Sequence, residues 1–261
     1  MSISGYGAVV TGAGRGLGAA AARRLVAEGA RVVVSDVDSA AALAMAQALD
    51  PSGTKCIAVA CDVTRPADCS QLVARAEEFF GAPVDIFVAH AGVGFAGSLL
   101  DASEESIRRV IEVNVLGAMF SAQAALRSLV KSPRASLIIT GSLQGVTSRP
   151  QRSGYTTSKH AIVGLVKSLA LEFGPQGVRV NSVAPASTDT PHLRAQLATE
   201  HQDVDLAVAK LARTMPLGRL PVADDFADAV VYLASPGARS ITGHTLLVDC
   251  GASAGLYKPP S

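Results

Sequence analysis

The chain has 261 residues, of which 49% are hydrophobic, and its mean hydropathy is +0.32. Its 23 Lys and Arg residues balance 22 Asp and Glu residues, for a formal net charge of +1. This composition supplies a large core, and the charge balance gives no reason to expect nucleic acid or an anionic membrane surface as a partner.

Short runs rich in Val and Ile alternate along the chain with longer Ala-rich stretches of helical character. We predict strands at 6–11, 30–36, 56–62, 84–90, 136–140, 178–185 and 244–249. Helices are predicted near 16–28, 39–49, 66–80, 103–131, 153–173 and 222–234. The strand runs are apolar throughout, which is typical of strands buried on both faces. The alternation predicts an α/β fold with a doubly wound parallel sheet of about seven strands, in a single domain over residues 1–261.

A polar stretch bounded by prolines, without a regular pattern, follows the sixth predicted strand and runs from 185 to 221. In sheets of this type, the loops after the carboxyl ends of the strands form the ligand crevice. An irregular segment of this length inside a compact domain is usually functional. We therefore expect a substrate lid at about 186–221.

Several other classes of protein lack their sequence signals here. The five histidines are scattered and no CxxC pair occurs, so we expect no metal site and four reduced thiols: Cys56, Cys61, Cys69 and Cys250. No apolar run reaches the roughly 18 residues of a membrane-spanning helix, and the N-terminus lacks a signal-peptide pattern. A cytoplasmic protein is expected.

The first predicted strand leads into the first helix through the glycine-rich turn "TGAGRGLG". Gly12, Gly16 and Gly18 permit a tight turn and a close approach of the backbone to a pyrophosphate, which the amino end of the helix attracts. Asp36 ends the second strand, where a carboxylate accepts hydrogen bonds from an adenosine ribose and repels a 2′-phosphate. Arg15 favours a 2′-phosphate, but repulsion between two close anions outweighs one flexible cation, and we predict NAD.

Tyr155 and Lys159 stand four residues apart in a predicted helix, so both project from one face. Such a pair is either a surface contact, in which the ring covers the lysine stem, or an acid–base pair. A free tyrosine has a pKa near 10, too high for an efficient base at neutral pH, and a nearby ammonium favours the phenolate. The rest of the chain decides between the two interpretations.

These residues belong to a longer ordered set. The set includes Thr11-Gly12-x-x-x-Gly16-x-Gly18, Asp62-Val63, Ala91-Gly92, Asn114 in "EVNVLG", Ser142, Tyr155-x-x-x-Lys159 and the tail "ITGHTLLVDCGA". In this order and at these spacings, the chain resembles the short-chain dehydrogenases/reductases over nearly its whole length. The resemblance implies a Rossmann-type fold and hydride transfer between NAD and a secondary alcohol, which is oxidised to a ketone or lactone.

The resemblance also implies roles for single residues. Tyr155 would be the general acid/base, and Ser142 would hydrogen-bond the substrate oxygen. Lys159 would contact the nicotinamide ribose and lower the pKa of the tyrosine, while Asn114 would hold a water in a proton relay. The expected cofactor-binding residues are Gly12, Arg15, Gly16, Leu17, Gly18, Asp36, Asp62, Val63, His90, Ala91, Gly92, Tyr155, Lys159, Pro185, Thr188 and Thr190. Relatives usually form tetramers through helices corresponding to those near 103–131 and 153–173, so a homotetramer is expected.

Three positions depart from the family pattern. His90 stands where an asparagine is usual, Ala186 follows Pro185 where glycine is usual, and Cys250 replaces a glycine near the C-terminus. None of the three is a catalytic group. These three departures concern the geometry of the expected lid and the packing of subunits, and they leave the expected reaction unchanged.

The substrate is expected to be small, polar and anionic: a hydroxy acid, a sugar acid or a sulfonated sugar. Arginine forks suit carboxylates and sulfonates, and Arg152 lies three residues before Tyr155. The candidate substrate-binding residues are Gln144, Arg149, Arg152, His192, Arg194 and Gln196. If the arginines lie on the rim, a neutral sugar, polyol or cyclic alcohol fits equally well. A 3-oxoacyl-carrier-protein-type ketoreductase and a non-catalytic NAD-binding sensor or scaffold are further alternatives.

Overall fold

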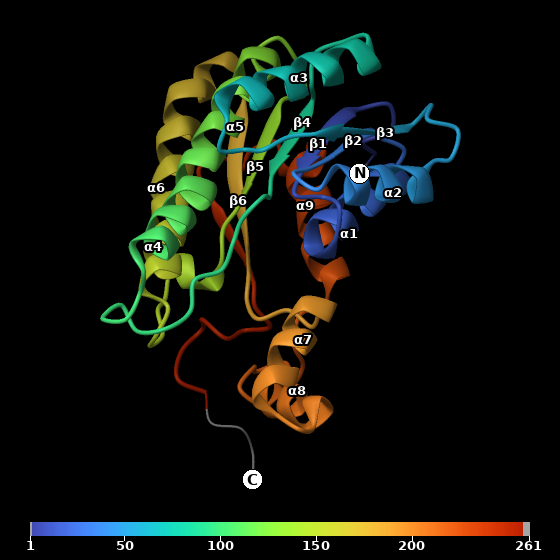
Figure 1. Cartoon of the computed structure of the whole chain (residues 1–261). Helices are drawn as coiled ribbons and strands as arrows, with labels where there is room; N and C mark the ends of the chain where they lie inside the picture. Colours follow the sequence, from blue (N-terminus) through green and yellow to red (C-terminus); the bar gives the residue numbers. More distant parts are fainter. Residues whose placement is uncertain (1, 258–261) are drawn as a thin grey trace.

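The computed structural model describes residues 2–257 of the chain (Figure 1). Seven parallel strands form one sheet in the order β3-β2-β1-β4-β5-β6-β7. The strands are β1 (Gly7–Thr11), β2 (Arg31–Asp36), β3 (Cys56–Ala60), β4 (Ile86–Ala89), β5 (Ser136–Thr140), β6 (Arg179–Pro185) and β7 (Thr245–Val248). The predicted doubly wound parallel sheet is confirmed.

Helices cover both faces of this sheet, with α3, α5 and α6 on one side and α1, α2 and α9 on the other (Figure 1). The helices are α1 (Gly16–Ala27), α2 (Ser39–Leu49), α3 (Pro66–Phe80), α4 (Glu104–Ile111), α5 (Gly117–Leu129), α6 (Ser153–Phe173), α7 (Pro191–Glu200), α8 (Val204–Ala212) and α9 (Ala223–Ala234). Within the described residues, no helix has the length and apolar character needed to cross a membrane.

Continuously apolar strands divide their side chains between two cores. On β4, Phe87 packs under α3 and α5, whereas Ile86 and Val88 pack under α1 and α9. The side chains still alternate with a period of two, but a helical layer covers each face and removes both sets from water. This burial on both faces is the reason that the strands read as unbroken hydrophobic runs.

The order of the strands reverses between β1 and β4, and the chain segments that follow these two strands meet there. Gly12 has φ +64°, and a Cβ at this position would lie 2.9 Å from Cα of Ala91. The Thr11 hydroxyl accepts hydrogen bonds from the amides of His90 (3.0 Å) and Ala91 (3.2 Å). The glycine and the threonine therefore hold the ends of β1 and β4 together at the position where doubly wound sheets bind their ligands.

Two predicted segments differ in the structure. The single helix expected over 103–131 is divided into α4 and α5 by a π-helical turn, Glu112–Leu116, which the apolar periodicity did not reveal. The segment 185–221, predicted to be irregular, contains α7 and α8 at the carboxyl edge of the sheet (Figure 1). Start signals for both helices were present: Thr190 caps α7 ahead of Pro191, and Asp203 caps α8.

All four cysteines are unpaired, as predicted, and Cys250 carries an unusual backbone conformation. Its φ of +51° lies in the left-handed region, which favours glycine. Cys250 replaces a glycine of the family pattern, so the chain retains the glycine conformation without the glycine.

We expect Cys250→Gly to raise the free energy of unfolding by about 0.5–1 kcal/mol, because the left-handed conformation then costs little. Guanidinium chloride unfolding of both proteins measures the difference. Cys250→Ala is the matched control, since it removes the thiol and keeps the Cβ. An equal gain from Cys250→Ala would show that the backbone is not the cause.

Candidate active site

The predicted catalytic residues converge at the carboxyl edge of the sheet. Ser142 follows β5, and Tyr155 and Lys159 project from the first two turns of α6. The Lys159 ammonium lies 5.7 Å from the centre of the Tyr155 ring, and Ser142 lies near enough to the Tyr155 phenol to lower its pKa. Asn114 reaches the same space from the π-helical turn, since a Cβ on Gly92 would lie 3.2 Å from its Oδ1 and 3.8 Å from Lys159 Nζ.

Lys159 is only 5% exposed, and its Nζ donates to the main-chain carbonyl of Thr140 at 2.9 Å. Burial lowers the pKa of its ammonium to about 8, because the charged form loses water. At neutral pH the group still carries its proton for most of the time. A buried, oriented cation that titrates near pH 8 suits a role beside an acid–base residue.

The pKa of Tyr155 is raised above its usual value of 10. Burial raises the pKa of this phenol most, and Ser142 and the charges of Arg152 and Arg149 oppose that effect. Desolvation outweighs these positive charges, which belong to the two arginines. The effect of Lys159 on this pKa stays a prediction.

The Ser142 hydroxyl has one hydrogen-bonding function left for the reaction. Its oxygen accepts a hydrogen bond from the amide of Gln144 at 3.1 Å, which caps the short helical turn Leu143–Gly145. A hydroxyl carries a single proton, and the amide contact leaves that proton free. Ser142 can therefore donate to the phenol or to a substrate oxygen.

The Asn114 side chain joins three segments. Its Oδ1 accepts from the amide of Val93 at 2.8 Å, and its Nδ2 donates to the Val93 carbonyl and to Ser158 Oγ, each at 3.0 Å. The side chain is 2% exposed. These contacts fix the loop after β4 against α6, and the water relay through Asn114 stays a prediction.

His90 also takes part in this network. Its Nδ1 shares a hydrogen bond with Thr140 Oγ1 at 3.1 Å, and its ring lies 5.5 Å from that of Phe226. Desolvation and the charge of Lys159 lower the pKa of His90 to about 4. The imidazole is therefore neutral at physiological pH, and it braces the threonine whose carbonyl holds Lys159.

The glycine-rich turn forms a cradle at the amino end of α1. A Cβ on Gly18 would lie 2.3 Å from the Gly12 carbonyl oxygen, so no side chain fits there. The N-cap residue, Arg15, makes no side-chain cap. The first amides of α1 thus keep the free N–H groups that bind a phosphate.

Asp36 is oriented by backbone groups that the sequence analysis did not single out. Its carboxylate accepts from the amides of Gly14 and Asp38, each at 3.0 Å. Arg15 extends away from this carboxylate and pairs with Asp38 at 2.5 Å. The sequence does show Asp38, the second acid of "DVD", which could have predicted the pair with Arg15. It gives no sign that the Gly14 amide bonds Asp36, apart from the place of Gly14 in the turn.

The remaining cofactor candidates lie along the same edge, and several of them already make hydrogen bonds within the chain. Asp62 Oδ1 accepts from both the amide and the hydroxyl of Thr64, which leaves its other oxygen available. Thr188 donates to the Ala186 carbonyl, and Thr190 caps α7. Leu17 lies in the first turn of α1, Val63 is buried against Gly117, Ala91 and Gly92 follow β4, and Pro185 ends β6.

Two arginines flank Tyr155 on the substrate side. Arg152 is half-buried and its Nη1 donates to the Phe95 carbonyl at 3.4 Å, while Arg149 is exposed at the rim. Partial desolvation and the charge of Arg152 lower the pKa of Arg149, so the two guanidinium groups repel one another. Neither has a carboxylate partner within residues 2–257. An anion between them would relieve that repulsion.

The other substrate candidates differ in what they offer. Gln144 accepts from the Thr156 hydroxyl at 3.2 Å, close to Ser142. Arg194 pairs with Asp189 (2.7 Å) and with Asp205 (2.8 Å), so its charge is already neutralised and it joins α7 to α8. Its predicted contact with the substrate stays a prediction. His192 is exposed on α7, and Gln196 is half-buried on the same helix.

Comparison with known proteins decides the family. Residues 12–253 match a family described as enoyl-(acyl-carrier-protein) reductase. L-rhamnose 1-dehydrogenase (NAD(P)(+)) from Azotobacter vinelandii is 38% identical, over 93% of this chain and 94% of its own. The chain belongs to the short-chain dehydrogenase/reductase family.

Two further members of the short-chain dehydrogenase/reductase family extend the comparison. Cis-4-hydroxycyclohexanecarboxylate dehydrogenase from Sinomonas cyclohexanicum is 35% identical, over 95% of this chain and 96% of its own. The structure of 3-ketoacyl-(acyl-carrier-protein) reductase from Brucella melitensis, complexed with NADH, superimposes with a TM-score of 0.86. It is 32% identical and covers 97% of this chain and 100% of its own.

Membership makes the protein an oxidoreductase that binds a nicotinamide cofactor and acts on a small molecule. The residues present fit such a cofactor. Gly18 lets the start of α1 pack against the Gly12 carbonyl, the first turn of α1 offers free amides, and Asp36 is oriented at the end of β2. Lys159 and Tyr155 lie at the same carboxyl edge of the sheet.

Buried Lys159 predicts a pH-dependent stability. Its pKa is about 8 in the folded chain against an ordinary value of 10.5, so between these values the unfolded chain holds a proton that the folded chain has lost. The free energy of unfolding of the wild type therefore rises with pH between these two values. Below about pH 8 the buried ammonium stays charged and lowers that free energy by its full amount. Lys159→Met removes this titration.

We expect Lys159→Met to be more stable than wild type near pH 7, with the difference shrinking by about 2 kcal/mol on going to about pH 9.5. Guanidinium chloride unfolding at several pH values measures both free energies. Lys167→Met, which changes an exposed lysine of α6, is the control and should show no such trend. A difference that stays constant with pH would contradict the lowered pKa of Lys159.

Proposed function

We propose that this protein is an NAD-dependent dehydrogenase that oxidises a secondary alcohol on a small, polar, anionic substrate to a ketone or lactone. The observation that carries the proposal is the desolvated Tyr155 phenol, whose pKa Ser142, Arg149 and Arg152 all lower against the effect of burial. An acid–base group and an anion-binding pair thus face the same end of the crevice.

The preference for NAD rests on charge at the end of β2. Asp36 presents a carboxylate where the 2′-oxygen of an adenosine ribose is bound in this fold. Asp38 adds a second negative charge and pairs with Arg15, the one cation of the glycine-rich turn. A 2′-phosphate would meet two carboxylates and a guanidinium that is already paired, so NADP is disfavoured.

Bound NAD supplies the hydride acceptor, and the chain's own residues manage the proton. Ser142 donates to the substrate oxygen and holds it within reach of Tyr155. Tyr155 accepts the hydroxyl proton as the carbon is oxidised, and the buried Lys159 ammonium stabilises the phenolate that this step requires. In the reverse direction the same phenol returns the proton.

An anionic substrate is supported by the unpaired guanidinium groups beside the phenol. Arg152 already donates to the Phe95 carbonyl, so its guanidinium loses little conformational entropy when it binds an anion. A carboxylate or sulfonate between Arg149 and Arg152 would be bound by both, and the reacting hydroxyl would lie toward Ser142. A relative that acts on a hydroxycyclohexanecarboxylate is consistent with this chemistry.

The helical pair α7–α8 is proposed as the substrate lid over about 186–221. It follows β6 at the carboxyl edge, and the Arg194 ion pairs with Asp189 and Asp205 make it move as one body. We further propose a homotetramer formed through α4, α5 and α6. Exposed Leu116 and Met119 beside the π-helical turn support an interface there.

Initial rates of NADH formation across matched neutral and anionic substrates test the function. The set contains sugars, sugar acids, sulfosugars and short hydroxy acids, each assayed with NAD+ and with NADP+. We expect the anionic members to give kcat/KM values about 10- to 100-fold higher than their neutral analogues, and NAD+ to outperform NADP+.

Arg152→Ala should abolish the advantage of the anionic substrates and leave the rates of neutral analogues nearly unchanged. Arg23→Ala, which removes an exposed arginine of α1, is the control and should change neither set of rates. If neutral polyols react faster in the wild type, the substrate class is a neutral sugar or polyol, as the name of the rhamnose-oxidising relative suggests. Turnover with NADP+ alone would overturn the role of Asp36.

A further inference from the structure

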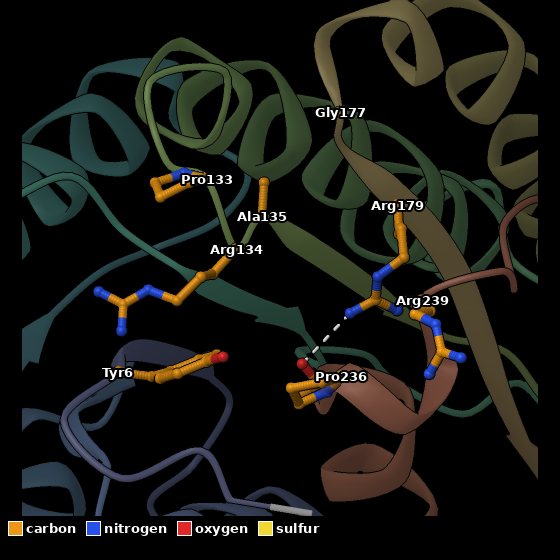
Figure 2. Close-up of a pocket in the computed structure, with 9 residues that line it drawn as sticks. Tyr6, Pro133, Arg134, Ala135, Gly177, Arg179, Pro236 and Arg239 are labelled. Atoms are coloured by element: carbon orange, nitrogen blue, oxygen red, sulfur yellow. Dashed lines mark hydrogen bonds between the residues drawn. The ribbon is translucent and has the colours of Figure 1, made fainter.

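A second pocket opens at the amino edge of the sheet, at the opposite ends of the strands from Tyr155 (Figure 2). Its volume is about 290 Å³. The walls come from the segments that precede β1, β5 and β6 and from the segment that follows α9. The lining residues are Tyr6, Pro133, Arg134, Ala135, Gly177, Arg179, Ala234, Pro236 and Arg239.

Three arginines converge on this pocket, and they differ in how their charges are balanced. Arg134 lies 4.4 Å above the Tyr6 ring and 3.5 Å from the Asp85 carboxylate. Arg179 donates to the carbonyls of Leu233 and Ala234 at the end of α9, the latter contact dashed in Figure 2. Arg239 is exposed and has no ion pair within the part of the chain that the structure describes.

The positive charge of the pocket is therefore only partly compensated. No Asp or Glu appears in the lining contributed by residues 2–257. The nearby carboxylate of Asp85 forms an ion pair with Arg134. Burial lowers the pKa of Arg179, whose partners are neutral carbonyl oxygens. A half-buried guanidinium with only neutral partners gains from a bound anion, because the anion replaces the water that was lost.

We propose that this pocket binds the phosphate or carboxylate group of a small molecule between Arg179 and Arg239, with the organic part of the ligand against the Tyr6 ring. Figure 2 shows these two arginines on one side of the pocket and Tyr6 with Arg134 on the other. Pro133 and Pro236 add rigid apolar walls. A pocket that combines guanidinium groups with an aromatic ring and two prolines matches an organic anion better than a bare ion.

The volume limits the size of the ligand. A dinucleotide is too large, and a single ring or short chain that bears one oxyanion fits. The site is separate from the crevice at the carboxyl edge, so its occupant is not the substrate proposed above.

Phenyl phosphate and benzoate are suitable probes, with phenol and inorganic phosphate as the uncharged and ring-free comparisons. Binding is measured by titration calorimetry on protein saturated with NADH, so that phosphate cannot enter the cofactor cradle. We expect phenyl phosphate and benzoate to bind more tightly than either comparison. Arg239→Gln should weaken both by about tenfold, the loss of one charge-assisted contact.

Two further variants make the assignment specific. Arg152→Ala removes the anion-binding group beside Tyr155 and should leave this binding unchanged. Arg23→Gln changes an exposed arginine of α1 outside the pocket and should also leave the binding of both probes unchanged. Arg239→Gln should retain wild-type turnover. Loss of binding in Arg152→Ala, equal binding in Arg239→Gln and wild type, or no binding of either anionic probe would each overturn the proposal.

Discussion

The hydrogen bond from the Lys159 ammonium to the Thr140 carbonyl joins α6 to the end of strand β5. Thr140 also bonds His90, which follows β4, and the His90 amide in turn bonds Thr11 at the end of β1. One buried cation is thus held by a chain of contacts that runs across three adjacent strands. The parallel sheet sets the positions of those strand ends, and the catalytic geometry follows from them.

Desolvation shifts the pKa values of Lys159 and Tyr155, the two proposed acid–base groups, in opposite directions. It lowers the pKa of Lys159 to about 8 and raises that of Tyr155, so both groups are moved away from their charged forms. Arg149 and Arg152 oppose the effect at the phenol. In the proposed function, a substrate anion that neutralises these arginines would also weaken their effect on the pKa of the phenol, so substrate binding and that pKa would be coupled.

The sequence analysis predicted the regular architecture correctly, because apolar strand runs leave a local pattern. The glycine-rich turn and the spacing of Tyr155 and Lys159 are also visible without a structure, and the roles drawn from them stay predictions. The π-helical turn around Asn114 was missed because a slightly wider turn leaves the apolar pattern nearly unchanged. The helices α7 and α8 were missed because the polar composition of 185–221 outweighed the helix caps at Thr190 and Asp203.

Contacts between distant residues could not be predicted in the same way. Nothing local marks Thr140 as the partner of both His90 and Lys159, and nothing local shows that Arg194 is neutralised by Asp189 and Asp205. The pocket at the amino edge is the extreme case, because its arginines come from segments far apart in the chain. Such sites depend on strand order, which the sequence specifies only through the whole fold.

The central claim is that the Tyr155 phenol carries the proton of the reaction. Tyr155→Phe removes only the hydroxyl, and its kcat/KM on the best substrate of the wild type is measured together with its Kd for NADH. The account predicts a loss of about 10³-fold or more in kcat/KM with a Kd within about twofold of wild type. Activity within about tenfold of wild type would contradict it, because another group would then be moving the proton.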